Sequence, residues 1–194
     1  MQISGLHHLR DLLGHSIRFL SSWTSAGLTH EGRIFVGAHV LAIPTGDFSA
    51  GATYCGEFIE ISTEWHQTSL GDDYHQLCVT RVSVPSEAGQ RIAVPGQGQY
   101  PFKGYPHFHG HYFSRPVTRI EVLERVVTNA EVNGDRVEQV IYDSHIRFIA
   151  GTHEAVLTTE HGVILGEIEL YAGLVGTITP RASDLVHTRM VMGL

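Results

Sequence analysis

Three histidines, His107, His109 and His111, alternate with other residues in a short aromatic segment, and imidazoles at this spacing could bind a divalent metal ion. Alternating side chains of a β-strand point to one face of the sheet. Two histidine side chains that leave the backbone roughly 7 Å apart can converge on one ion with Zn–N bonds of about 2.0–2.1 Å. His107 and His111 are too far apart to share that ion unless the strand bends, and Gly110 is a residue at which it could bend.

The remaining ligands of such a site must come from another strand. Asp143 and His145 have the same two-residue spacing, so a second pair on a neighbouring strand would complete a site for Zn, Fe or Mn. The ion would act as a Lewis acid, or activate water or oxygen, in a reaction on a small molecule.

The same segment supports a second interpretation, in which aromatic side chains bind a ligand. The aromatic residues around the histidines are Tyr105, Phe108, Tyr112 and Phe113. They would form a pocket wall, at 105–113, for an apolar or aromatic small molecule or a partner chain, and the histidines would form its polar, pH-sensitive rim. This interpretation needs fewer coincidences, so we favour small-molecule binding, with a metal-dependent enzyme as the alternative. Whether the chain is an enzyme stays open.

Two other groups of reactive residues are weaker candidates. Asp143-Ser144-His145 contains the residue types of a hydrolytic triad. Neighbours on a regular strand point to opposite faces, so the serine and the histidine are not expected to meet. Cys78, near His75 in the sequence, is interpreted as a buried structural cysteine and not as a reactive thiolate.

Length and composition predict one ordered, soluble domain over residues 1–194. Hydrophobic residues make up 42% of the chain and charged residues 17%, which is typical of a globular protein. The net charge of −7 and the absence of basic runs argue against a nucleic-acid partner. Cys55 and Cys78 are too few for a disulfide scaffold and favour a reducing, cytoplasmic compartment. Charged residues and histidines interrupt the apolar N-terminal stretch, so no secretory or membrane segment is expected.

Hydrophobic periodicity predicts one helix followed by strands. The helix has apolar residues at three- and four-residue steps, with Ser4 as its cap: Leu6, Leu9, Leu13, Ile17 and Leu20. Strands are predicted at 33–43, 54–66, 75–84, 153–159 and 163–171. In the second of these, the apolar face carries Ile59, Ile61 and Trp65, and the polar face carries Glu60, Ser62, Glu64 and His66. The segment 185–192 is apolar and has no clear assignment.

Asn133-Gly134 predicts a β-hairpin, because this dipeptide fits the two-residue turns that match strand twist. Pairing outward from the turn sets the following residues opposite each other: Glu131 and Arg136, Val127 and Val140, Arg125 and Tyr142. This register puts Glu121 on the face opposite to His145, so the two could share a site only if the register slipped.

The predicted elements indicate a mainly β fold, an antiparallel barrel or two-sheet sandwich of about eight strands with an amphipathic N-terminal helix. The alternative is an α+β fold in which the helix packs on one wrapped antiparallel sheet. Residues 85–106 are rich in proline and glycine and form either a lid over a pocket or a linker between two β halves. The N-terminal apolar stripe and the long strands offer self-complementary surfaces, which favours a homodimer.

Overall fold

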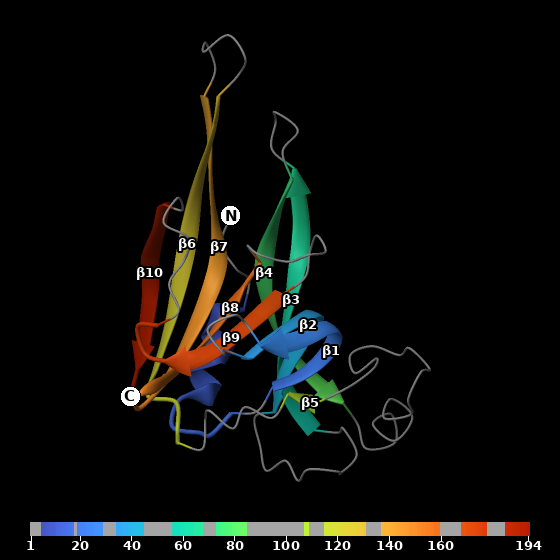
Figure 1. The fold of residues 1–194 in the computed structure, drawn as a ribbon, viewed down its shortest axis with the longest axis vertical. Helices are drawn as coiled ribbons and strands as arrows, with labels where there is room; N and C mark the ends of the chain where they lie inside the picture. The colour runs from blue at the N-terminus through green and yellow to red at the C-terminus, as the bar shows by residue number, and fades with distance from the viewer. Residues whose placement is uncertain are drawn as a thin grey trace.

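A computed structural model of the chain describes residues 5–17, 19–28, 34–44, 56–67, 73–84, 107–108, 115–130, 137–159, 168–177 and 185–194. Within these residues the fold is mainly β (Figure 1). The elements are η1 (Leu6–Leu12), β1 (Phe19–Leu28), β2 (Ile34–Pro44), β3 (Gly56–Gln67), β4 (Asp73–Val84), β5 (His107–Phe108), β6 (Arg119–Ala130), β7 (Val137–Ala150), β8 (His153–Thr158), β9 (Ile168–Leu174) and β10 (Leu185–Gly193). None of the helical structure within these ranges has the length and apolar character needed to cross a membrane.

The described strands form one antiparallel sheet with the order β10-β6-β7-β8-β9-β2-β1-β5. The sheet forks at β2, which pairs with β9 through residues 34–38 and with β3 through residues 40–44. β4 then pairs with β3. In Figure 1, β10, β6 and β7 stand on one side and β3 and β4 on the other. The predicted mainly β, antiparallel fold is confirmed, but the strand pairings found among the described residues do not close into a barrel.

The apolar core packs against one face of this sheet, which we call the inner face. Burial of these side chains is the main driving force for folding. The core residues alternate along their strands with residues of the opposite, outer face. They include Ile59 and Ile61 of β3, Leu77 and Val79 of β4, Ile120 and Val122 of β6, Ile146 and Phe148 of β7, Leu157 of β8, and Ile168 and Leu170 of β9.

The N-terminal segment differs from the amphipathic helix that its periodicity predicts. The helix η1 is a 3-10 helix of only 7 residues, with Gly5 and not Ser4 at its N-cap, and the chain is already extended from Phe19 onward. A 3-10 helix has three residues per turn, so residues three apart lie on one side. Leu6, Leu9 and Leu12 occupy these positions and are buried in the core. The three-residue spacing of these leucines is therefore that of a 3-10 helix. Hydrophobic periodicity did not predict the strand β1.

The register predicted for the β6–β7 hairpin is correct near the turn. Val127 pairs with Val140, and Arg125 pairs with Tyr142. The turn itself and the predicted pair of Glu131 with Arg136 lie outside the described residues, as does the predicted loop at 85–106.

Farther from the turn the predicted register is wrong by one residue. A β-bulge interrupts the ladder, so that Leu123 pairs with His145 while Glu124 pairs with Asp143, and Ser144 is the extra residue. Because a slip of one residue exchanges the two faces of a strand, Glu121 lies on the same face as His145. The sequence pattern could not reveal this slip, because a bulge adds a residue without a distinctive residue type.

Candidate functional site

The histidine run meets the sheet at its shortest described strand. β5 consists of His107 and Phe108, and it pairs with the first two residues of β1. β5 is the last strand in the hydrogen-bonded order, and β8, β9, β2 and β1 lie between it and β7. β5 is therefore not a hydrogen-bonded neighbour of β7, the strand that carries the other predicted ligand pair, Asp143 and His145.

The side chains of the histidine run lie outside what the structure describes. This holds for the predicted pocket wall and metal ligands Tyr105, His107, Phe108, His109, His111, Tyr112 and Phe113. Among the side chains that are described, no group of three or more His, Cys, Asp and Glu could hold a metal ion. The site for Zn, Fe or Mn and the aromatic pocket wall both stay predictions.

His145 contacts its neighbour Ser144, with 2.6 Å between Nδ1 and Oγ. The expectation that these two side chains cannot meet was wrong, because the bulge interrupts the alternation of faces at this point. The bulge also interrupts the simple two-residue spacing that would place Asp143 and His145 on one face. Ser144 is 0% exposed, so the contact between its hydroxyl and the ring of His145 is buried.

The outer face of the sheet buries many polar side chains. Eight polar or charged residues within the described ranges are buried, and all except Ser144 alternate with core residues along their strands. Burying a charge is costly unless it is paired, so the partners of each group decide its role. The seven residues are Glu60, Gln76, Glu121, His145, Glu154, Thr158 and Glu169.

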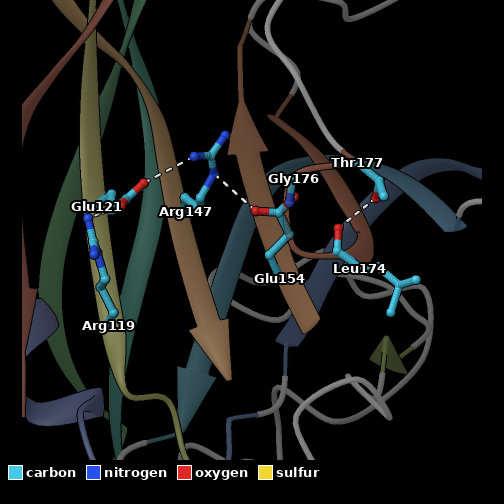
Figure 2. A network of polar contacts seen from close by, with 7 residues as sticks. All are labelled: Arg119, Glu121, Arg147, Glu154, Leu174, Gly176 and Thr177. Atoms are coloured by element: carbon cyan, nitrogen blue, oxygen red, sulfur yellow. Dashed lines mark hydrogen bonds and ion pairs between the residues drawn. The ribbon is translucent and has the colours of Figure 1, made fainter. Parts of the chain in front are cut away.

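Arg147 connects two of these carboxylates (Figure 2). Its Nη1 lies 3.1 Å from Oε2 of Glu121, and its Nε lies 3.2 Å from Oε2 of Glu154. The other oxygen of each carboxylate also has a partner: Nη2 of Arg119 is 2.6 Å from Glu121, and the backbone N–H of Gly176 donates to Glu154 over 2.9 Å. The contact between Nε of Arg147 and Oε2 of Glu154 is an ion pair and not a hydrogen bond. Because the chain itself supplies the opposite charge, we assign this network a role in packing β6, β7 and β8.

Glu169 is partnered in the same way, since its Oε2 accepts a hydrogen bond of 2.7 Å from the hydroxyl of Tyr171. On β8, Thr158 lies in register between His145 and Glu169. The carboxylates of Glu121, Glu154 and Glu169 therefore have partners within the fold, and we assign the outer face of β6 to β9 a structural role.

The outer face of the β3–β4 hairpin carries a second set of polar side chains, which we call the polar strip. Its residues form four cross-strand pairs, in which opposed Cβ atoms lie about 4.5–5.5 Å apart. The pairs are His66 with Tyr74, Glu64 with Gln76, Ser62 with Cys78, and Glu60 with Thr80. None of these residues is lysine or arginine, in contrast to the outer face of β6 to β9.

Gln76 is the most deeply buried residue of the polar strip, at 2% exposure. Its Oε1 accepts no hydrogen bond from the described parts of the chain. Nε2 of His66 is buried as well; its nearest acidic oxygen is Oε2 of Glu64 at 3.6 Å, which is beyond a hydrogen bond. A buried polar atom without a partner costs about 1–3 kcal/mol, and native proteins contain few of them. Both atoms could accept a hydrogen bond from a ligand bound at this position.

Carboxyl and thiol groups surround this position. The side chain of Glu64 is 60% exposed, and its Oε2 accepts a hydrogen bond of 3.7 Å from the thiol of Cys78. Burial, with a further contribution from the charge and hydrogen bond of Glu64, raises the pKa of Cys78 to about 11. Burial also raises the pKa of Glu60. The thiol is therefore protonated at neutral pH and acts as a hydrogen-bond donor and not as a nucleophile.

Aromatic rings close one end of the polar strip. The ring of His66 stacks on Tyr74, with 5.2 Å between centroids and 22° between planes. The ring of Tyr74 also contacts the ring of Tyr142 in β7, with 4.8 Å between their centroids. These rings lie beside the pair of Glu64 and Gln76 and give the strip an apolar wall, which small-molecule sites usually combine with a few polar groups.

The raised pKa of Cys78 gives a prediction for thiol chemistry. In a Cys55→Ser protein, we expect Cys78 to react with iodoacetamide at pH 8 about 100-fold more slowly than a free cysteine, because little thiolate is present. Glu64→Gln removes a charge and a hydrogen bond that raise the pKa, so it should speed the reaction several-fold. The pH dependence of the alkylation rate measures both effects. Glu124→Gln is the control for loss of a negative charge, and a wild-type midpoint below pH 9 would contradict the prediction.

Part of the polar strip is visible in the sequence. The alternation in β3 correctly separates Ile59 and Ile61 from the polar side chains of the strip. Trp65 was expected to join the apolar face but is 56% exposed. The sequence pattern did not indicate that Gln76 is buried or that Tyr74 belongs to the strip. The burial of a strand residue depends on what the folded chain packs against it.

Comparison with models of known protein families, with curated protein sequences and with solved structures found no match to this chain.

Proposed function

We propose that this protein binds a small molecule at the polar strip of the β3–β4 hairpin. The observation that carries the proposal is Gln76, a fully buried side chain whose Oε1 has no donor within the described residues. A donor supplied by a ligand would remove the cost of this unpaired acceptor.

Two further features support binding at this position. The exposed carboxylate of Glu64 is paired in register with Gln76, so a polar group of a ligand could reach the strip from solvent. The rings of His66, Tyr74 and Tyr142 supply an apolar wall beside it. A buried polar anchor, an exposed charge and aromatic contacts are the usual components of a small-molecule site.

A ligand-observed NMR screen of the full chain against a library of small fragments tests the proposal. We expect a group of fragments that bind the wild-type protein and lose most of their saturation-transfer signal with Gln76→Leu, which keeps the side-chain size but removes the acceptor. Gln67→Leu is the matched control, because Gln67 belongs to the same hairpin and is exposed.

The screen also separates this position from the aromatic segment at 105–113. Fragments lost with Phe108→Ala and Tyr112→Ala but retained with Gln76→Leu would place binding at the predicted pocket wall and overturn the polar strip as the site. The polar strip is also overturned if no fragment distinguishes Gln76→Leu from Gln67→Leu.

A further inference from the structure

We infer that the ligand of the polar strip carries a protonated amine; this inference rests on the function proposed above. It follows from the hydrogen-bonding character of the strip, from its charge and from the position of its aromatic rings.

Three acceptor atoms of the strip belong to neighbouring residues, His66, Glu64 and Gln76. Oε1 of Gln76 and the carboxylate of Glu64 can only accept, and Nε2 of His66 accepts when the proton is on Nδ1. Nε2 of His66 lies 3.6 Å from Oε2 of Glu64, and Glu64 pairs with Gln76 across the hairpin. The three acceptors therefore belong to neighbouring positions on one face of the hairpin. An ammonium group carries three N–H donors and no acceptor, which matches this set.

The charge of the strip favours a cation. It contains the exposed carboxylate of Glu64 and neither lysine nor arginine. The buried carboxylates of β6 and β8 differ in this respect, because Arg147 lies between them. A cationic ligand would give Glu64 the partner that an arginine supplies there, and hydrogen bonds between charged groups are roughly twice as strong as neutral ones.

The aromatic rings fit the remainder of such a ligand. Tyr74 lies between His66 and Tyr142, at the end of the strip next to the acceptors. A small apolar or aromatic group attached to the amine would contact these rings while the ammonium group reaches Glu64 and Gln76. The ligand class is therefore a small amine with an apolar substituent.

Four probes with one phenylethyl skeleton test the inference by isothermal titration calorimetry on the full chain. They are 2-phenylethylamine, 2-phenylethanol, 3-phenylpropanoate and trimethyl(2-phenylethyl)ammonium. We expect the amine to bind at least about tenfold more tightly than the alcohol, and the carboxylate to bind most weakly. The trimethylammonium compound, which keeps the charge but has no N–H donor, should lie between the amine and the alcohol.

Variants connect this order to the polar strip. Glu64→Gln should weaken binding of the amine at least about tenfold and change binding of the alcohol less than twofold. Glu124→Gln, which removes a negative charge on β6, should leave both unchanged. If the amine does not bind, or binds no better than the alcohol or the carboxylate, the inference is overturned. Binding of other fragments that depends on Gln76 would still support the proposed function, so the two failures are distinguishable.

Discussion

Replacing Arg147 by methionine is expected to lower the free energy of unfolding by about 3–5 kcal/mol, the usual cost of removing one partner from a buried ion pair. Methionine preserves most of the apolar part of the arginine side chain. The loss of stability is therefore due to removal of the guanidinium group. Without that group, Glu121 and Glu154 lose their shared cation, although their side chains are only 9% and 0% exposed. Urea denaturation followed by circular dichroism measures the change.

Arg119→Met is the matched control for this prediction. Arg119 also contacts Glu121, through Nη2 at 2.6 Å, but its side chain is 52% exposed, against 20% for Arg147. An exposed ion pair contributes about 0–1 kcal/mol, because water solvates both partners when they separate. Equal losses for the two arginine variants would show that the network on β6 to β8 does not behave as a buried one.

A double-mutant cycle with Glu154→Gln isolates the pair itself. Glutamine keeps an oxygen to accept the hydrogen bond from the N–H of Gly176 and removes only the charge. Once Glu154 is neutral, loss of Arg147 deprives only Glu121 of a cation, and Glu121 keeps Arg119 as a partner. The loss caused by Arg147→Met should therefore become smaller. Additive losses would mean that Arg147 and Glu154 are not coupled.

This network could be predicted only in part, and the reason is one residue. The register predicted from Asn133-Gly134 is correct for Arg125 and Val127. The bulge at Ser144 then moved Glu121 to the face of His145 and opposite Arg147. Hydrophobic alternation detects which face is buried, but a single extra residue changes the face without changing the composition of the strand.

The burial of polar groups was equally hidden in the sequence. Alternation places Glu60 on the face opposite to Ile59 and Ile61, and such a face is expected to meet solvent. Glu60 and Gln76 are nevertheless 5% and 2% exposed. Burial of an outer face depends on segments distant in the sequence, so a periodic pattern within one strand could not reveal the polar strip.

The attachment of η1 to the sheet leads to the second large effect. Gly5→Ala is expected to lower the free energy of unfolding by about 2–4 kcal/mol, from backbone strain and forced movement of packed groups. Gly5 has φ of 81°, a left-handed conformation that costs an L-residue about 1–2 kcal/mol. A Cβ at Gly5 would also collide with the backbone carbonyl oxygen of Val79 in β4. Because β4 is held by its pairing with β3, η1 must move away.

Gly176→Ala separates the two contributions. Gly176 has the same φ of 81°, but a Cβ there would meet nothing within 4 Å, so only the backbone strain remains. We therefore expect the alanine at Gly176 to cost about 1 kcal/mol and the alanine at Gly5 to cost clearly more, both measured by urea denaturation. The difference between the two losses of stability measures how much the packing of η1 on β4, through its buried leucines Leu6 and Leu9, contributes to the free energy of unfolding. Equal losses would mean that η1 shifts without losing its contacts with the core, and that its packing on β4 contributes little to stability.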